Sequence, residues 1–361
     1  MTRIGIFGGT FNPPHLGHRK AAQYFQQSLA LDQLLIVPAQ QAPLRATPMV
    51  IAPGGAFGED RLALCERTFP FPVSDVELRR PGISYTIDTL RELRAQYPDA
   101  EFFLLVGEDQ RGKFHQWKDW QEVLQLAELI VLPRTGAGED RDGFVPLEIS
   151  STQLRLKLLL GEDCSGFLSP EALEYINEKR LYQPLTPERL HHGKCVAEAA
   201  EALARQYGAD PAKARLAGLT HDCAKSMPFE TQEQLCARYG RPLRPEDLAA
   251  PPVCHAFAGE AYLALECGVT DPEVLGAVRW HTLGHAGMTL LEEVVYVADL
   301  VSADRSYPDV ERTREHAARD LHAASKYILE YIFARQTGKG RPIHPDSLAW
   351  YEELTNPKET F

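Results

Sequence analysis

The stretch IGIFGGTFNPPHLGH, residues 4–18, carries the strongest fold signal in the first half of the chain. Its apolar start, Ile4–Phe7, predicts a short buried strand, and Leu16–Leu29 can form a helix directly after the loop. Gly8 and Gly9 carry no Cβ, so the backbone of this loop can come close to a ligand. The sequence therefore predicts a strand, a ligand-binding loop and a helix in succession.

Two histidines stand at the expected start of this helix. His15 and His18 are three residues apart, which allows both rings to face the same side of the helix. Because a helix N-terminus favours anions, this arrangement suits a polyphosphate. A Gly-Pro turn with two incidental histidines is the alternative interpretation.

The remainder of the first half alternates strand and helix patterns. Further strands are expected at 34–37, 73–78, 102–106 and 129–132, and helices at 61–69 and 86–97. Such alternation is typical of an α/β, Rossmann-like domain with a parallel sheet and helices on both faces. Ligands of these sheets bind beyond the carboxyl ends of the strands, where the loop at residues 8–18 would lie.

Length and composition narrow the class of protein. The 361 residues suggest two domains, and the net charge of −12 argues against a broad nucleic-acid surface but not against small phosphates. Seven cysteines, an odd number without a CxxC pair, are typical of reduced thiols. The start MTRIGIFGGT has no hydrophobic signal region, and no apolar run of about 18 residues follows. We therefore expect a cytoplasmic protein that does not associate with membranes, whereas the sequence leaves its oligomeric state open.

Four blocks in the first half occur in the order typical of one enzyme family. They are residues 8–18, then Ile83-Ser84-Tyr85-Thr86 with Asp88-Thr89-Leu90, then Gly107-Glu108-Asp109 with Phe114, Trp117 and Trp120, and finally Ile149-Ser150-Ser151-Thr152-Gln153-Leu154-Arg155. On these blocks, residues 3–183 resemble the nicotinate-nucleotide adenylyltransferases of the nucleotidyltransferase superfamily. The resemblance implies that the 5′-phosphate of nicotinate mononucleotide attacks the α-phosphorus of ATP, which carries Mg²⁺. Deamido-NAD and pyrophosphate would be the products.

The same resemblance assigns residues to roles. His15, His18 and Arg155 would act in catalysis as cationic or donor groups. Residues implied to bind ATP are Gly8, Gly9, Thr10, Phe11, His15, His18, Ser151, Thr152 and Arg155, and those implied to bind the mononucleotide are Tyr85, Thr86, Asp109 and Trp117. Taken singly, Arg155 could be a solvated cation, Trp117 a core residue and Asp109 a turn former.

One segment departs from this family. Where a Pro-Pro-His-Lys stretch usually follows the second strand, this chain has Gln41-Ala42-Pro43-Leu44-Arg45 and a Pro/Gly-rich segment that continues to Gly58. Arg45 could replace the lysine, but the histidine has no counterpart. The departure bears on substrate recognition more than on the class of reaction.

A boundary is expected at residues 183–187, which divides the chain into domains 1–185 and 186–361. The second domain has helical patterns almost to its end. Asp210-Pro211 and Asp271-Pro272 are helix starts, because Asp caps a helix and Pro suits its first position. Nine of the twelve histidines lie in this domain, which suggests a metal site.

Helical periodicity places metal-compatible side chains on the apolar faces of four helices. His192, His221, His281 and Asp299 each extend such a face, and His255 stands near the start of another helix. A single buried histidine is usually a core residue, but five such positions, with Asp222 beside His221, favour ligation. Imidazole and carboxylate ligands without thiolates suit iron, manganese or another divalent transition metal at an open catalytic site, rather than structural zinc.

Residues 187–355 resemble the HD superfamily, and within it the bacterial symmetrical bis(5′-nucleosyl)-tetraphosphatases. The stretches that carry the resemblance are Arg189–Val196, Leu219–Lys225, Val253-Cys254-His255, Ala277–Gly284 and Tyr296–Asp299. The family implies two metal ions, one held by His192, His221, Asp222 and Asp299 and the other by Asp222, His255 and His281. Lys225 and Arg305 would bind phosphate, although each could be a solvated cation. Ser302-Ala303-Asp304 departs from the family's Glu-Pro pairing at this point.

These resemblances imply a bifunctional enzyme: an adenylyltransferase joined to a hydrolase that converts diadenosine tetraphosphate to two ADP. Two alternatives remain open at this stage. One is another nucleotidyltransferase fused to an HD nucleotidase or phosphodiesterase. The other is an HD half that senses nucleotides without catalysis.

Overall fold

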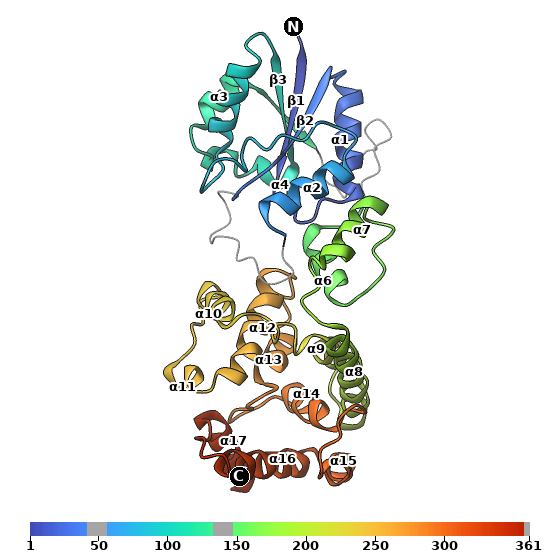
Figure 1. Cartoon of the computed structure of the whole chain (residues 1–361), viewed down its shortest axis with the longest axis vertical. Coiled ribbons are helices and arrows are strands. Elements are labelled where there is room, and N and C mark those ends of the chain that lie inside the picture. The colour runs from blue at the N-terminus through green and yellow to red at the C-terminus, as the bar shows by residue number, and fades with distance from the viewer. Residues whose placement is uncertain (42–55, 133–146, 357–361) are drawn as a thin grey trace. The chain divides into compact units, whose positions relative to one another are not determined.

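The computed structural model describes residues 1–41, 56–132 and 147–356. The chain divides into two compact units, one of residues 1–158 and 162–182, the other of residues 159–161 and 183–361. The division after residue 182 lies three residues before the boundary expected from the sequence. Each unit is described by itself below (Figure 1).

A four-stranded parallel sheet forms the centre of the first unit. Its strands are β1 (Arg3–Gly9), β2 (Gln33–Pro38), β3 (Glu101–Gly107) and β4 (Glu128–Leu132), in the spatial order β2-β1-β3-β4. Apolar side chains of these strands are buried on both faces of the sheet. This explains why the strands are near-continuous apolar runs in the sequence rather than alternating patterns.

Helices cover both faces of this sheet, as expected. α1 (Leu16–Ser28) and α2 (Gly58–Thr68) share one core with the sheet, which includes Phe25, Ile36 and Phe103. α3 (Thr86–Gln96) and α5 (Trp120–Leu126) share the other, around Leu90 and Leu104. The other elements of the unit are α4 (Glu108–Arg111), the 3₁₀ turn η1 (Phe114–Gln116), α6 (Ser151–Leu159) and α7 (Pro170–Lys179).

The prediction of a strand at residues 73–78 is wrong. Only Val73 pairs with the sheet, through an isolated bridge to Ile36. Beyond it the backbone closes on itself, because the Arg79 amide bonds to the Asp75 carbonyl at 3.0 Å and the Arg80 amide to the Glu77 carbonyl at 3.2 Å. These local turn bonds replace the ladder that a fifth strand needs.

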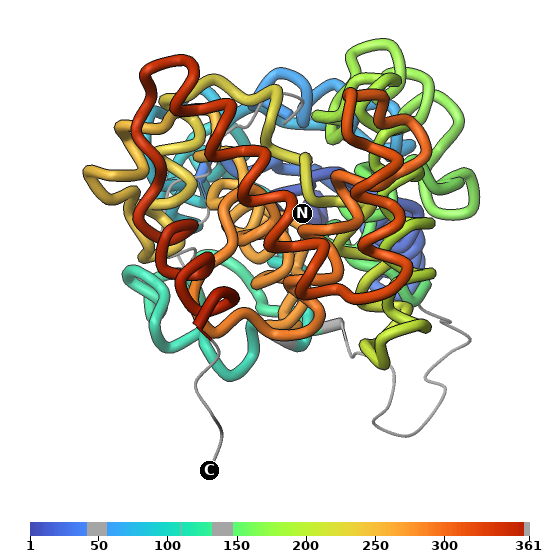
Figure 2. The backbone as a smooth tube through the Cα atoms, turned by 90° about the horizontal axis from the view of Figure 1, so that it is seen from below, coloured from blue at the N-terminus to red at the C-terminus, as the bar shows by residue number. Residues whose placement is uncertain are grey.

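The second unit is helical throughout its described part. Its elements are α8 (Pro187–Tyr207), α9 (Pro211–Thr220), α10 (Phe229–Arg238), α11 (Pro245–Leu248), the 3₁₀ turn η2 (Pro251–Val253), α12 (Cys254–Leu265), α13 (Pro272–Trp280), α14 (Leu290–Val301), α15 (Val310–Arg319), α16 (Leu321–Thr337) and α17 (Pro345–Thr355). The caps of α9 and α13 are as expected, since Asp210 and Asp271 accept hydrogen bonds from the first backbone amides of these helices. α14 packs against α8, α13 and α16, and Figure 2 traces α14 to α17 in orange and red.

Two further expectations concern the whole chain. All seven cysteines are free thiols, and six of them are buried. Within the described residues, no helix is both long and apolar enough to span a lipid bilayer.

Candidate functional sites

The two histidines of the first loop cap helix α1 together. His15 is the N-cap residue, and its Nδ1 accepts a hydrogen bond from the His18 backbone amide at 3.3 Å. The His18 Nδ1 accepts one from the His15 amide at 3.2 Å, and the ring centroids are 3.6 Å apart. Gly17 leaves room for the His15 ring, because any other residue would place a Cβ 2.9 Å from the His15 Nδ1. The three-residue spacing of the two histidines thus allows their imidazoles to form a capping box.

The capping geometry determines which proton each ring carries. Since both Nδ1 atoms accept hydrogen bonds, the neutral rings carry their protons on Nε2. Burial lowers the pKa of His15 to about 4, and burial together with the neighbouring His15 holds the pKa of His18 well below its ordinary value. At neutral pH the pair therefore offers two neutral N–H donors. Of the two roles expected from the sequence, cation or hydrogen-bond donor, only the donor role remains.

Side chains from the end of the first unit hold the loop that precedes these histidines. Arg155, which is buried, donates from Nη1 to the Asn12 carbonyl at 2.6 Å. The Ser151 hydroxyl donates to the Pro13 carbonyl at 2.8 Å, and the Tyr182 hydroxyl to the Asn12 Oδ1 at 2.7 Å. The predicted site residues Ser151 and Arg155 thus lie at the loop, in bonds that fix its backbone.

A second buried arginine joins this loop to the segment after β2. Arg61 is 1% exposed and donates to the Thr10 carbonyl at 2.9 Å and to the Ala39 carbonyl at 2.5 Å. Arg61 was not predicted as a site residue, because a charged residue within a helix pattern is usually exposed. The neighbouring segment that carries Arg45 lies outside the described residues.

The residues predicted to bind the mononucleotide lie at the start of α3, at the end of η1 and in α4. Tyr85 is the N-cap residue of α3, and Thr86 is the first residue of that helix. Trp117 ends the turn η1 and, like Tyr85, is half-buried against the core beneath. The Lys118 ammonium lies 4.7 Å from the centroid of the Tyr85 ring, which ties the two segments together. Asp109 falls in α4, and its side chain is outside the described part of the structure.

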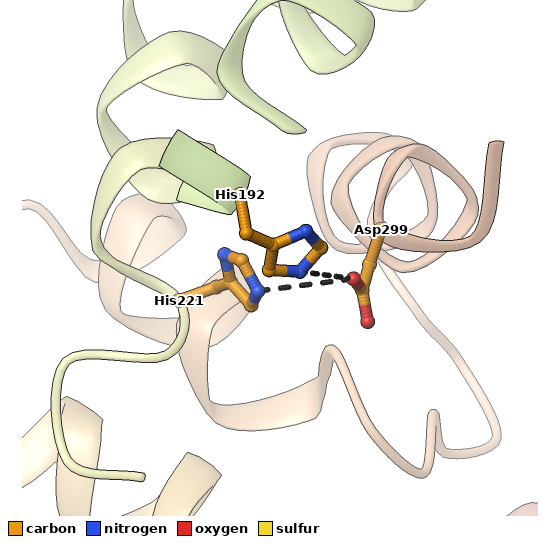
Figure 3. A group of neighbouring side chains, drawn as sticks. All are labelled: His192, His221 and Asp299. Atoms are coloured by element: carbon orange, nitrogen blue, oxygen red, sulfur yellow. Dashed lines mark hydrogen bonds and ion pairs between the residues drawn. The ribbon is translucent and has the colours of Figure 1, made fainter. Parts of the chain in front are cut away.

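In the second unit, three side chains from three elements converge (Figure 3). His192 extends from α8, Asp299 from α14, and His221 from the end of α9. The Asp299 Oδ1 lies 3.0 Å from the His192 Nε2 and 3.8 Å from the His221 Nε2. α8 and α9 can approach this closely because Gly218 has no side chain. A Cβ at this position would lie only 2.8 Å from the Ala197 Cα.

Asp222 forms the centre of an adjoining group. Its Oδ1 lies 3.0 Å from the His255 Nε2 and 3.6 Å from the His281 Nε2, and its Oδ2 lies 3.6 Å from the His221 Nε2. The carboxylate is 2% exposed. All six predicted ligands are thus brought together, with Asp222 facing both groups.

The hydrogen bonds of these imidazoles show that the group fits a metal. His221, His255 and His281 each direct Nδ1 at a backbone carbonyl, of Gly218, Pro252 and Val278, at 2.7, 2.8 and 2.7 Å. A carbonyl only accepts, so Nδ1 carries the proton and the Nε2 lone pair points at Asp222. Burial lowers the pKa of His221 to about 4 and also lowers that of His255, so both are neutral at pH 7.

Lone pairs that converge on a carboxylate repel one another unless a cation lies between them. The buried His221 Nε2 and Asp222 Oδ1 have no hydrogen-bond partner. Each is the atom that would coordinate an ion. The donor set of imidazoles and carboxylates therefore fits a divalent transition metal.

A cavity of about 460 Å³ opens beside this group. Three cationic side chains line it: Arg189, Lys225 and Arg305. Arg189 and Lys225 contact the Asp222 Oδ2 at 3.2 and 2.9 Å, and Arg305 forms an ion pair with Asp299. Lys225 and Arg305 were predicted to bind phosphate, whereas Arg189 was noted only as part of the sequence resemblance. Cations around a metal-binding group suit a substrate that carries several phosphates.

Comparison with known proteins gives both halves a family. Residues 6–157 match the cytidylyltransferase-like family model, and residues 189–304 match the HD domain model. A probable nicotinate-nucleotide adenylyltransferase from Opitutus terrae is 40% identical over 193 residues, which cover 50% of this chain and 98% of the relative. A symmetrical bis(5′-nucleosyl)-tetraphosphatase from Bacillus subtilis is 37% identical over 174 residues, which cover 48% of this chain and 93% of the relative. The chain belongs to the nicotinate-nucleotide adenylyltransferase family in its first half and to the HD superfamily in its second.

A solved structure resembles the HD half as well. The crystal structure of a predicted HD superfamily hydrolase involved in NAD metabolism, from Clostridium acetobutylicum, is 32% identical. It covers 48% of this chain and 93% of its own, with a TM-score of 0.47. Both sequence resemblances are confirmed at the level of family, as is the fold class of an α/β domain followed by a helical HD domain.

Sequence reasoning missed several side chains that hold the two sites. Asn12 and Tyr182 are 170 residues apart, and His192 and Asp304 are 112 residues apart. Asn12 and Tyr182 were not predicted as site residues, and Asp304 was named only as part of a departure from the HD pattern. No local periodicity relates residues so distant in the chain.

Proposed function

We propose that the first unit transfers the adenylyl group of ATP to nicotinate mononucleotide, which forms deamido-NAD and pyrophosphate. The observation that carries this proposal is the pair of neutral imidazoles at the N-terminus of α1. Their two Nε2–H groups, at the positive end of the helix dipole, form a pair of donors for phosphate oxygens. The family membership of this half supports the same reaction.

The chemistry asks the protein for positioning and charge stabilisation rather than for a covalent intermediate. His15 and His18 would donate hydrogen bonds to the ATP phosphates, whose charge increases in the in-line transition state. Gly8, Gly9, Thr10 and Phe11 would bring the backbone against ATP. Arg155 would act mainly by fixing the loop, because its guanidinium is bound to the Asn12 carbonyl. Mg²⁺ would arrive with ATP.

The mononucleotide would bind at the other edge of the site. Tyr85, Thr86 and Trp117, and Asp109 by family resemblance, would hold it, with the indole against the pyridine ring. A pocket that hydrogen-bonds the carboxylate of nicotinate rejects the amide, because its donors would be left unpaired. We therefore expect nicotinate mononucleotide to be preferred over nicotinamide mononucleotide.

The test is product analysis with ATP and either mononucleotide, on the full chain and on variants that keep the helix cap. His15→Asn and His18→Gln retain capping side chains but lose the Nε2–H donors. Both should release pyrophosphate far more slowly, whereas His115→Ala, at an exposed site on η1, should behave like the unaltered chain. Equal kcat/KM for the two mononucleotides would reject the deamido assignment but leave adenylyl transfer intact.

For the second unit, we propose metal-dependent hydrolysis of diadenosine tetraphosphate to two ADP. The cavity beside the ligand cluster, with Arg189, Lys225 and Arg305 on its wall, is the observation that supports it. His192, His221, Asp222 and Asp299 would hold one ion, and Asp222, His255 and His281 the other. Bound divalent ions supply Lewis-acid polarisation of phosphate oxygens and lower the pKa of water. Iron is our first choice and manganese the second, because both accept imidazole and carboxylate ligands.

The cationic side chains on the cavity wall would bind the outer phosphates of the chain and leave a central phosphorus beside the ligand cluster. Such binding would give a symmetrical cut, in which each product keeps two phosphates. Lys225 and Arg305 were predicted for this role, and Arg189 now joins them. Arg305 would also keep the Asp299 carboxylate in place through their ion pair.

Metal analysis and turnover on one preparation test this function. The purified chain should contain transition metal and convert diadenosine tetraphosphate to ADP alone. AMP with ATP as products would indicate an asymmetrical hydrolase, and turnover of another nucleotide alone would indicate a different HD nucleotidase. Tight binding of the tetraphosphate by metal-loaded protein without turnover would favour a sensing module.

A further inference from the structure

The histidines of the metal group differ in what holds their Nδ1 atoms. For His221 and His281, the acceptor is the carbonyl three residues earlier, in the last turn of α9 and of α13. For His255 it is the Pro252 carbonyl, in the turn η2 that precedes α12. Carbonyls at helix ends and in short turns lack an α-helical partner, so they are free to accept from a side chain.

His192 differs from these three histidines in its place in the helix. It lies within α8, which runs from Pro187 to Tyr207, and carbonyls in the interior of a helix already accept bonds from the amides four residues later. Its acceptor comes instead from a distant part of the chain. The His192 Nδ1 lies 2.7 Å from the Oδ2 of Asp304, in the segment after α14.

A hydrogen bond to Ser302 fixes the orientation of the Asp304 carboxylate. Its Oδ1 accepts a hydrogen bond from the Ser302 hydroxyl at 2.8 Å, which leaves Oδ2 for the imidazole. Ser302 is fully buried and caps the C-terminus of α14, the helix that carries Asp299. One helix end thus presents a predicted ligand, Asp299, to one nitrogen of His192 and a carboxylate acceptor to the other.

From this arrangement we infer that Asp304 is a positioning residue for the proposed metal ion whose ligands are His192, His221, Asp222 and Asp299. The Asp304 carboxylate fixes the proton of His192 on Nδ1, turns the ring toward Asp299, and leaves the Nε2 lone pair for the ion. A carboxylate also makes the imidazole a stronger donor to the metal than a carbonyl does. The inference rests on the metal centre of the proposed function.

Binding of Co²⁺ to the full chain tests the inference without reference to activity. The protein is stripped with a chelator and titrated with Co²⁺ against a competing chelator, while the visible absorption of the ion is recorded. Asp304→Ala should weaken one of the two ions by about 10- to 100-fold and leave the other unchanged. Asp304→Asn keeps an acceptor oxygen without the charge, so it should restore part of the affinity. Glu315→Ala removes an exposed carboxylate from α15 and should bind as the unaltered chain does.

Each outcome has one meaning. If the unaltered chain binds no Co²⁺, the metal centre itself is wrong. If it binds two ions and Asp304→Ala matches Glu315→Ala, the role of Asp304 is wrong although the metal centre stands. If both ions weaken equally, Asp304 supports the fold rather than His192, which also overturns the inference. Should Asp304→Ala fail to fold by circular dichroism, Asp304→Asn decides: weaker binding of one ion supports the role, and unaltered binding of both rejects it.

Discussion

Replacement of Tyr182 by phenylalanine removes one oxygen atom from the first unit and nothing else. The Tyr182 hydroxyl donates to the Asn12 Oδ1 at 2.7 Å, and both residues are at least 95% buried. Asn12 lies in the loop that leads to His15, so this bond ties the end of the unit to the loop proposed to bind phosphate. Loss of a buried hydrogen bond of this kind costs about 1 kcal/mol in the free energy of unfolding.

That cost can be measured in two ways. For a unit of this size, about 1 kcal/mol lowers the midpoint of thermal unfolding by roughly 2–4 °C. If the whole amount appears in the positioning of ATP, kcat/KM for adenylyl transfer falls by about fivefold. Calorimetry of the full chain gives the first quantity, with the transition of the first unit assigned by its upward shift on addition of ATP.

Tyr175→Phe is the matched control. The Tyr175 hydroxyl donates to the Asp60 Oδ1 at 3.0 Å, but the residue is only half-buried and water can replace the bond. Its midpoint and kcat/KM should therefore remain nearly unchanged, as should hydrolysis by the second unit in both variants. Equal midpoints and equal kcat/KM for the two variants would refute the claim that Tyr182 holds the loop.

Three further expectations concern the second unit and the boundary. Asp222→Ala should lose most of its transition metal, measured by mass spectrometry, and nearly all tetraphosphate hydrolysis. Lys225→Ala should keep its metal, and adenylyl transfer should survive in both variants. Full hydrolysis by Asp222→Ala would exclude a ligand shared by the two ions. Residues 1–185 and 186–361, expressed separately, should each be soluble with one activity, and two inert fragments would show that the halves depend on each other. The His322 Nδ1 lies 2.8 Å from the Glu293 carboxylate, which raises the pKa of His322 above 6.5. This pair therefore stabilises the fold fully below pH 6.5 and less as the pH rises through the raised pKa. The thermal midpoint of His322→Gln should accordingly differ more from the unaltered chain at pH 6 than at pH 9, and a constant difference would contradict this.

Features that depend on neighbours in the chain could be predicted from the sequence. The strands β1 to β4 were expected to within two residues at each end, because a strand buried on both faces is an uninterrupted apolar run. Helical spacing alone placed His192, His221, His281 and Asp299 on inward faces, and these four converge in the structure.

Properties set by distant contacts could not be predicted. The neutral state of His15 and His18 results from burial and from their mutual capping, which the spacing of the motif does not reveal. The acceptor of His192 lies 112 residues away, in a segment whose sequence departs from the family pattern. Likewise, the pattern at 73–78 fits a strand, but the turn that forms after Val73 prevents the pairing.

The ligand cluster also has a mechanical consequence. Its side chains come from α8, α12 and α14 and from the C-terminal ends of α9 and α13, so the two proposed ions would together join five helices. The energy with which the protein holds its metal is therefore also energy that holds the helices together. If the proposed function holds, a cell short of that metal would lose hydrolysis in two ways: the site would be inactive, and proteases would degrade the loosened chain. Because the adenylyltransferase is part of the same polypeptide, its abundance would decline with the same metal supply.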